Sequence, residues 1–206
     1  HASEGLPVTM ENELAARNRF VAATFAEAAR LHECMRDLDP TPILAAVDAI
    51  DAAITAGGKA LVFGNGGSAA DAQHFAAEFV GRFGRERRAL AAVALTADAS
   101  VLTAVSNDYG FEHLFARQIE ALGRCEDVVL GISTSGRSPN VAHAFATADT
   151  LGINSISLTG GRGGLVAEAA RISITVPSDE TPRIQELHRT ILHIICDLIE
   201  REIALS

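Results

Sequence analysis

The sequence of 206 residues is short of several residue types, and each shortage limits what the protein can do. Lys59 is the only lysine, and no segment has the G-x-x-x-x-G-K-[ST] pattern of a nucleotide-binding P-loop, so that type of site is excluded. Basic residues number 17 against 26 acidic ones, and the formal charge of -9 argues against a nucleic-acid partner. Glu86 interrupts the one basic cluster, which we expect to be solvated or salt-bridged. Its members are Arg82, Arg85, Arg87 and Arg88.

Cysteines and long apolar runs are scarce as well. The three cysteines, Cys34, Cys125 and Cys196, lie far apart and show no C-x-x-C spacing, a usage that indicates a reducing cytoplasm. No apolar run approaches the roughly 20 residues of a membrane span, and no charged-then-apolar leader is present. We therefore expect a soluble cytoplasmic protein without a membrane partner.

Apolar residues account for 48% of the chain and aromatic residues for only 5%, which favours helices packed closely over small side chains. A chain of this length can bury roughly 70% of its unfolded surface, so it needs no disulfide or metal merely to fold. Residues 1–9 show no periodic pattern and precede Met10, and we interpret them as a tag or disordered leader. Residues 10–206 are expected to form a single domain with an N-terminal helical extension.

Predicted helices and strands alternate along most of the chain. Apolar residues at three- and four-residue steps predict a first helix over 11–38, which Pro40 and Pro42 end, and a second helix over 43–56. Five short apolar runs then predict strands, separated mostly by helix-compatible stretches. These runs lie at 59–67 (a strand that runs into a glycine turn), 89–95, 127–132, 153–158 and 172–176. The order predicts an α/β fold whose parallel sheet is covered on both faces.

The last segment, 183–205, is apolar almost all round. A helix of this kind must be buried on every side, and we expect it to lie in a helical bundle shared between subunits.

Three loops follow predicted strands, and ligands of parallel sheets collect at such carboxyl ends. Loop 133–138 has four hydroxyls in six residues beside a glycine, a composition that can donate several hydrogen bonds to one anion. Loop 64–68 matches the dinucleotide pattern G-x-G-x-x-A, but no acidic residue ends the second strand at the expected distance. Loop 159–164 fits a ligand loop or a tight connection equally well. A phosphorylated small molecule therefore fits better than a nucleotide.

Two polar sets interrupt apolar helices. His74 and Glu78 are four residues apart and share a helix face, either as a surface pair or converging on a ligand. Gln185, His188 and His193 interrupt the terminal helix, and Gln185 and His193 lie about 80° apart on a helical wheel. His193 can be a buried neutral histidine, or the two histidines, the carboxylate and the amide can bind a divalent metal such as zinc.

Five segments carry a family resemblance. They read GNGGSAADAQHFAAEFVGRF, SNDYGF, GISTSGRSPN, LTGGRGG and RIQELHRTILHIICDLIE. In this order they resemble the phosphoheptose isomerases, the sedoheptulose 7-phosphate isomerases of the sugar-isomerase (SIS) superfamily. The resemblance implies a flavodoxin-like five-stranded parallel sheet flanked by helices, and a homotetramer with active sites at subunit interfaces. It also implies conversion of D-sedoheptulose 7-phosphate to D-glycero-D-manno-heptose 7-phosphate, the first step towards nucleotide-activated heptose.

The resemblance also assigns residues. It places the catalytic glutamate and histidine at Glu78 and His193. It places one zinc ion per active site on His74, Glu78, Gln185 and His193. It places substrate contacts on Asn65, Gly66, Gly67, Ser68, Asn107, Asp108, Ser133, Thr134, Ser135, Ser138 and Gln185. Arg137 and Pro182 depart from the family pattern, where asparagine is commoner and some members have aspartate, and either change can alter the preferred sugar.

Aldose–ketose isomerisation needs a proton moved between C1 and C2 and another moved between the two oxygens. We assign Glu78 as the base at carbon and His193 as its partner at oxygen; a zinc ion on these groups would instead polarise the oxygens. The main alternative is a non-enzymatic SIS protein that binds the replication initiator DnaA, but that relative lacks the acid and the histidine present here. A sugar-phosphate-sensing module is a third possibility, although no accompanying DNA-binding segment is recognised.

Overall fold

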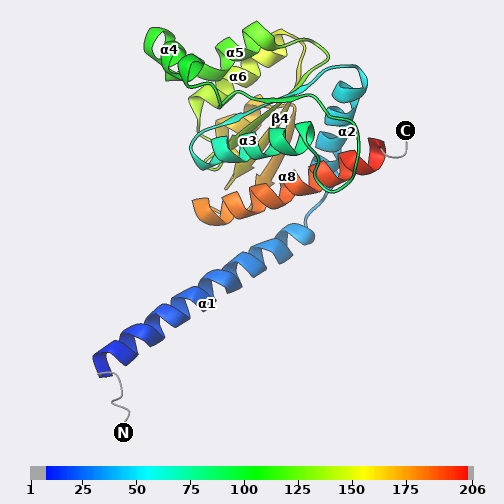
Figure 1. Cartoon of the computed structure of the whole chain (residues 1–206). Helices are drawn as coiled ribbons and strands as arrows, with labels where there is room; N and C mark the ends of the chain where they lie inside the picture. Colours follow the sequence, from blue (N-terminus) through cyan, green and yellow to red (C-terminus); the bar gives the residue numbers. More distant parts are fainter. Residues whose placement is uncertain (1–7, 204–206) are drawn as a thin grey trace. The chain divides into compact units, whose positions relative to one another are not determined.

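The computed structural model describes residues 8–203, and the chain divides into two units between Leu38 and Asp39. The first unit is one helix, α1 (Val8–Arg36), which confirms the predicted N-terminal helix (Figure 1). Along α1, Phe20 and Phe25 are each 73% exposed. Of the predicted leader, residues 1–7 lie outside the described residues, and α1 begins at Val8.

The second unit is built on a five-stranded parallel sheet. Its strand order, β2-β1-β3-β4-β5, is that of flavodoxin-like proteins, so the predicted fold class is confirmed. The predicted second strand is shortened to three residues at the sheet edge. The strands are β1 (Ala60–Gly64), β2 (Ala92–Ala94), β3 (Val128–Ser133), β4 (Asn154–Gly160) and β5 (Ile172–Val176).

Helices cover both faces of the sheet (Figure 1). One face is covered by α2 (Thr41–Thr55), α3 (Gly67–Val80) and α8 (Thr181–Ile203). The other carries α4 (Ala99–Tyr109), η1 (Phe111–His113), α5 (Leu114–Leu122), α6 (Pro139–Thr150) and α7 (Gly164–Ala169). No helix within residues 8–203 combines the length and apolarity that crossing a lipid bilayer requires.

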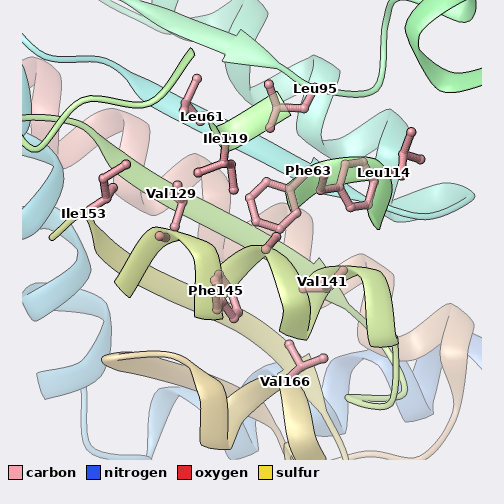
Figure 2. Packing of buried hydrophobic residues seen from close by; sticks show 13 residues of the cluster. Leu61, Phe63, Leu95, Leu114, Ile119, Val129, Val141, Phe145, Ile153 and Val166 are labelled. Atoms are coloured by element: carbon pink, nitrogen blue, oxygen red, sulfur yellow. The ribbon is translucent and has the colours of Figure 1, made fainter. Parts of the chain in front are cut away.

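An apolar cluster fills the space between the sheet and helices α5 and α6 (Figure 2). The Phe63 ring of β1 lies 5.0 Å from that of Phe115 and 5.8 Å from that of Phe145. Close packing of this kind leaves strands little freedom to shift, so the loops at their carboxyl ends start from fixed positions.

Helix α8 is buried in this chain on one face only. Ile191, Ile195 and Ile199 are at most 2% exposed, whereas Ile194 is 41% exposed. The expected burial on every side is therefore not met within the described part of one chain, and the intersubunit bundle stays a prediction. The predicted end of this helix at 205 falls outside the described residues.

Candidate active site

The site begins where the chain leaves β1 and β3 in opposite directions. After β1 it enters α3 on one face of the sheet, and after β3 it enters α6 on the other, which makes this the topological switch point where ligands of such sheets bind. Asn65 and Asn140 connect its two sides, because each side-chain amide donates to the other's oxygen at 2.9 Å. Asn140 is 1% exposed and was missed by the sequence analysis. The only indication in the sequence was its position two residues after the hydroxyl loop 133–138.

Glycines at the first turn of α3 bring α8 close. Gly66 has a φ of +57°, a conformation that favours glycine, and a Cβ at Gly67 would meet the Gln185 amide, which would have to move. Ser68 on the same turn is 3% exposed. The structure thus brings together four of the predicted substrate residues, three from the loop after β1 and Gln185 from α8.

The hydroxyl loop after β3 is held by its own side chains. The hydroxyls of Ser133 and Ser138 lie 2.8 Å apart, and Ser135 Oγ accepts a hydrogen bond from the Arg137 amide at 3.2 Å. A pocket of about 390 Å³ opens beside this loop. It is lined by Thr134, Ser135, Arg137, Gly160, Gly161, Arg162, Gly164, Asp179 and Thr181. The third glycine loop therefore borders the same pocket as the hydroxyl loop, together with the first residue of α8.

His74, Glu78 and His193 meet between α3 and α8. The Nε2 atoms of His74 and His193 are 2.8 Å apart, and Glu78 Oε1 lies 3.5 Å from His74 Nε2. The side chains of His74 and Glu78 are 32% and 21% exposed, so they remain open to a ligand. The helical pair and the terminal-helix histidine therefore share one site, as the converging alternative predicts.

The pKa of His193 lies below its ordinary value. Burial is the main cause, and the neighbouring His74 and Arg189 lower the pKa further, whereas Glu78 opposes them. Because an ordinary histidine has a pKa near 6.5, the His193 imidazole is largely uncharged at pH 7 and can accept a proton.

His188 is not part of this group. It is fully buried, and its Nε2 donates to the carbonyl oxygen of Thr159 at 3.0 Å. Burial lowers its pKa, so it is a neutral structural histidine. The sequence analysis left open that His193 is a buried neutral histidine. His188 is that histidine instead, because α8 turns its side chain toward the sheet.

The donor types at the site fit zinc. Two imidazole nitrogens that face one another and a nearby carboxylate are groups that bind this ion, whereas the Gln185 amide is placed only against Gly67. Among residues 8–203, however, no group of three or more His, Cys, Asp and Glu side chains is arranged to hold a metal. Zinc binding therefore stays a prediction.

Asn107 and Asp108 lie apart from the rest of the predicted residues. They belong to the end of α4, and Asn107 Nδ2 donates to Asp108 Oδ1 at 2.7 Å. Within the described range, no hydrogen bond or ion pair joins either to the other predicted site residues. Asp98, which follows the second strand, caps α4 by accepting from the amides of Ser100 and Val101 at 2.9 and 3.1 Å.

Known proteins with this arrangement identify the family. A profile of the SIS domain matches residues 24–160. The phosphoheptose isomerase of Geotalea daltonii is 58% identical over 168 residues, covering 82% of this chain and 87% of the relative. The solved phosphoheptose isomerase of Neisseria gonorrhoeae is 45% identical with a TM-score of 0.84, covering 89% of this chain and 98% of that one. The chain belongs to the phosphoheptose isomerase family.

A second solved member, from Francisella tularensis, is 38% identical with a TM-score of 0.86 and covers 90% of this chain and 98% of that one. Membership in the phosphoheptose isomerase family makes the chain a sugar-phosphate isomerase with an SIS domain. The DnaA-binding alternative gains no support from these relatives. A solved transcription-factor domain from Sphaerobacter thermophilus, 20% identical with a TM-score of 0.61, shows only that the fold is shared.

Proposed function

We propose that this protein interconverts D-sedoheptulose 7-phosphate and D-glycero-D-manno-heptose 7-phosphate, the first step towards nucleotide-activated heptose. One observation carries the proposal. The Glu78 carboxylate and the facing imidazoles of His74 and His193 lie on the two helices that border the loops suited to a phosphate. A carboxylate and an imidazole are the two groups that aldose–ketose isomerisation requires.

In the proposed reaction, Glu78 removes a proton from C1 of the ketose and an enediol forms. The Glu78 carboxyl then protonates C2, and because its proton exchanges with water, the proton returned to carbon is at least partly derived from solvent. His193, uncharged at neutral pH, moves the proton between the two oxygens, because the lowered pKa of its imidazole leaves a free nitrogen. The hydroxyls of Ser133, Ser135 and Ser138 bind the phosphate at the far end of the sugar, away from the reacting carbons.

A zinc ion, where bound, would be held by His74, Glu78, Gln185 and His193, and it would supply polarisation of the carbonyl and enediolate oxygens. The two imidazoles would then serve as ligands in their neutral form. Elemental analysis of the purified chain tests this part of the proposal: we expect one zinc per chain, lost in His74→Ala. A chain that is active and free of zinc would remove the metal from the account.

The proposal includes a homotetramer with active sites at subunit interfaces. Asn107 and Asp108 lie on α4 without a bond to the other predicted residues, and we expect them to serve the site of a neighbouring subunit. The apolar residues of α1, with Phe20 and Phe25 exposed, are the candidates for contact between subunits.

The test of the function is turnover of sedoheptulose 7-phosphate by the purified chain, followed by NMR as loss of the ketose and gain of the aldose. Unphosphorylated sedoheptulose is the control substrate, and we expect it to react far more slowly because the phosphate loop would be empty. No turnover of the phosphate ester would contradict the proposal. Equal turnover of both sugars would contradict the role of the hydroxyl loop.

A further inference from the structure

Glu200 is a buried carboxylate on α8 that is not among the three side chains of the proposed reaction, His74, Glu78 and His193. Its side chain is 1% exposed and accepts hydrogen bonds from the amides of Phe83, Gly84 and Arg85 at 2.7, 2.8 and 2.8 Å. The Arg87 Nε atom lies 3.1 Å from Glu200 Oε1, the oxygen that also accepts from the Phe83 amide. Burial raises the pKa of Glu200, but these amides and Arg87 outweigh burial and hold the pKa below its usual value. Glu200 is therefore ionised and fixes the loop that follows α3.

Arg87 connects that loop to the end of α3. Its side chain is 4% exposed, and it donates to the carbonyl oxygens of Glu78 at 2.7 Å, Phe79 at 2.9 Å and Gly81 at 3.1 Å. The last carbonyls of a helix have no partner within the helix, so a guanidinium that binds several of them fixes the position of its final turn. Glu78 itself stands in that turn.

The loop that follows α3 also contacts His193, the proposed catalytic histidine on α8. The Phe83 ring, whose amide is held by Glu200, lies 5.2 Å from the His193 ring with 40° between the two planes. His193 and Glu200 are seven residues apart on α8, two helical turns, so they share one face of the helix. The network thus runs from α8 through the loop to α3 and back onto α8.

We propose that Arg87 and Glu200 are positioning residues that hold Glu78 and His193 in the relative positions that the proposed reaction requires. The inference rests on the proposed isomerase function, and neither residue touches the substrate in it. Glu200 and Arg87 also satisfy backbone amides and carbonyls, so both residues contribute to folding, and the positioning role is the further effect of these bonds on the last turn of α3 and on the loop beside His193. Misplacement of reacting groups by about 1 Å can cost a hundredfold in rate, so loss of the residues that hold them in position should lower kcat strongly.

The chain offers a matched control at the opposite end of the sheet. Asp127 is 3% exposed, accepts from the amides of Lys59 and Arg124 at 2.9 Å each, and pairs with Lys59 Nζ at 2.6 Å. It lies beside the first residues of β1 and β3, whereas the proposed site lies beyond their carboxyl ends. Asp127→Asn therefore breaks a buried, amide-bonded ion pair without touching the site.

The experiment compares Glu200→Gln, the double variant Arg87→Met with Glu200→Met, and Asp127→Asn in the full chain, with kcat, KM and thermal stability measured for each. The double variant leaves no buried charge unpaired, but the amides of Phe83, Gly84 and Arg85 lose their acceptor, so we expect both Glu200 variants to lose stability, and kcat is compared at a temperature where each is folded. We expect kcat to fall about ten- to a hundredfold in both Glu200 variants, with KM changed less than about threefold. Asp127→Asn should lose stability and keep kcat within about twofold of the wild type.

Wild-type kcat in the folded double variant would overturn the proposal, as would an equal loss of kcat in Asp127→Asn. Crystal structures provide a readout that does not depend on activity. The His74–His193 contact of 2.8 Å and the Phe83–His193 ring contact of 5.2 Å should be lost or lengthened in the double variant and kept in Asp127→Asn. Unchanged contacts in the double variant would refute positioning. A wild type without turnover would contradict only the proposed function, and the structures would still decide the positioning role.

Discussion

At the residue scale, the proposed mechanism divides proton transfer between Glu78 and His193, which lie on two helices. Glu78 stands in the last turn of α3 and His193 near the middle of α8, and His74 lies between them, 3.5 Å from the Glu78 carboxylate and 2.8 Å from the His193 ring. In the proposal, Glu78 can therefore act on the carbon-bound proton while His193 acts on the oxygen-bound one.

Glu78→Gln and His193→Gln should each lower kcat at least ~100-fold, the low end for a positioned acid or base. Glutamine keeps hydrogen-bonding capacity while removing the titrating group, so both variants should fold. Steady-state kinetics on sedoheptulose 7-phosphate and circular dichroism provide the measurement. Turnover near that of the wild type in either folded variant would remove that residue from the mechanism.

Ser135→Ala tests phosphate recognition separately from chemistry. The phosphate is remote from the reacting carbons, so the loss should appear mainly in KM. A hydrogen bond to a charged group contributes roughly 1.5 to 3 kcal/mol, or about ten- to a hundredfold in affinity. Calorimetric titration of substrate in a Glu78→Gln background measures binding without turnover. Thr150→Ala, which removes an exposed hydroxyl at the end of α6, is the control. Equal affinity in the Ser135 variant would make the loop a structural turn.

The residues that sequence could predict at this scale are those with local patterns. The four-residue spacing of His74 and Glu78 and the hydroxyl-rich loop 133–138 are visible in short windows. Arg87 and Glu200 are not, because their contact joins segments far apart in the chain; the expectation that the basic cluster is solvated or salt-bridged holds for Arg87, but the sequence did not indicate its partner. The Arg87 side chain is buried, whereas Arg82, Arg85 and Arg88 are exposed.

At the element scale, α8 combines an apolar face with polar residues of different roles. Gln185 packs on the first turn of α3, His188 points into the core and His193 faces the site. Sequence predicted the helix and its polar positions, but it could not separate the buried histidine from the reacting one. That distinction depends on which face of α8 packs against β4, a contact between distant segments.

His188 should make stability depend on pH. Its folded pKa lies below the value of 6.5 because burial disfavours the charged ring, so the unfolded chain binds more protons below pH 6.5. Stability is therefore fully present above pH 6.5 and falls as the pH drops from there towards the lowered folded pKa.

Urea unfolding at pH 7.5, 6.5 and 5.5, at one protein concentration, measures the effect. We expect His188→Gln, whose amide nitrogen can take the place of Nε2 and donate to the Thr159 carbonyl, to show a smaller loss of unfolding free energy between pH 6.5 and 5.5 than the wild type. The same loss in both proteins would mean that His188 does not set this dependence. His193 shifts in the same direction and remains in both, so a reduced slope is expected rather than a flat one.

At the scale of the whole molecule, the parallel sheet covered on both faces followed from alternation of apolar runs and helical stretches, whereas its flavodoxin-like strand order was implied only by the family resemblance. The edge strand β2 was overpredicted, because Leu90 and Leu95 are buried by packing beyond the strand that lies between them. The structure of one chain does not show what covers the apolar residues of α1. Leu14 and Val21 are 50% and 53% exposed, and Phe20 and Phe25 are exposed as well.

Light scattering should report a tetramer. Phe20→Ser with Phe25→Ser removes two large apolar side chains from α1, so the assembly should weaken while the α/β unit stays folded, since α1 forms its own unit. The exposed substitution Arg19→Ser is the control. A wild type that is a stable monomer at micromolar concentration would contradict both the bundle and the interface sites.

The central claim, proton transfer through an enediol with Glu78 as the base, is tested most directly by running the reaction in D₂O. Proton NMR of sedoheptulose 7-phosphate with the wild type should show heptose 7-phosphate carrying solvent deuterium at C2, because the proton returned to carbon has been held on an exchangeable carboxylate. Glu78→Gln should give no such product on the same time scale. Product that forms without any deuterium at C2, or labelled product made equally fast by Glu78→Gln, would contradict the account.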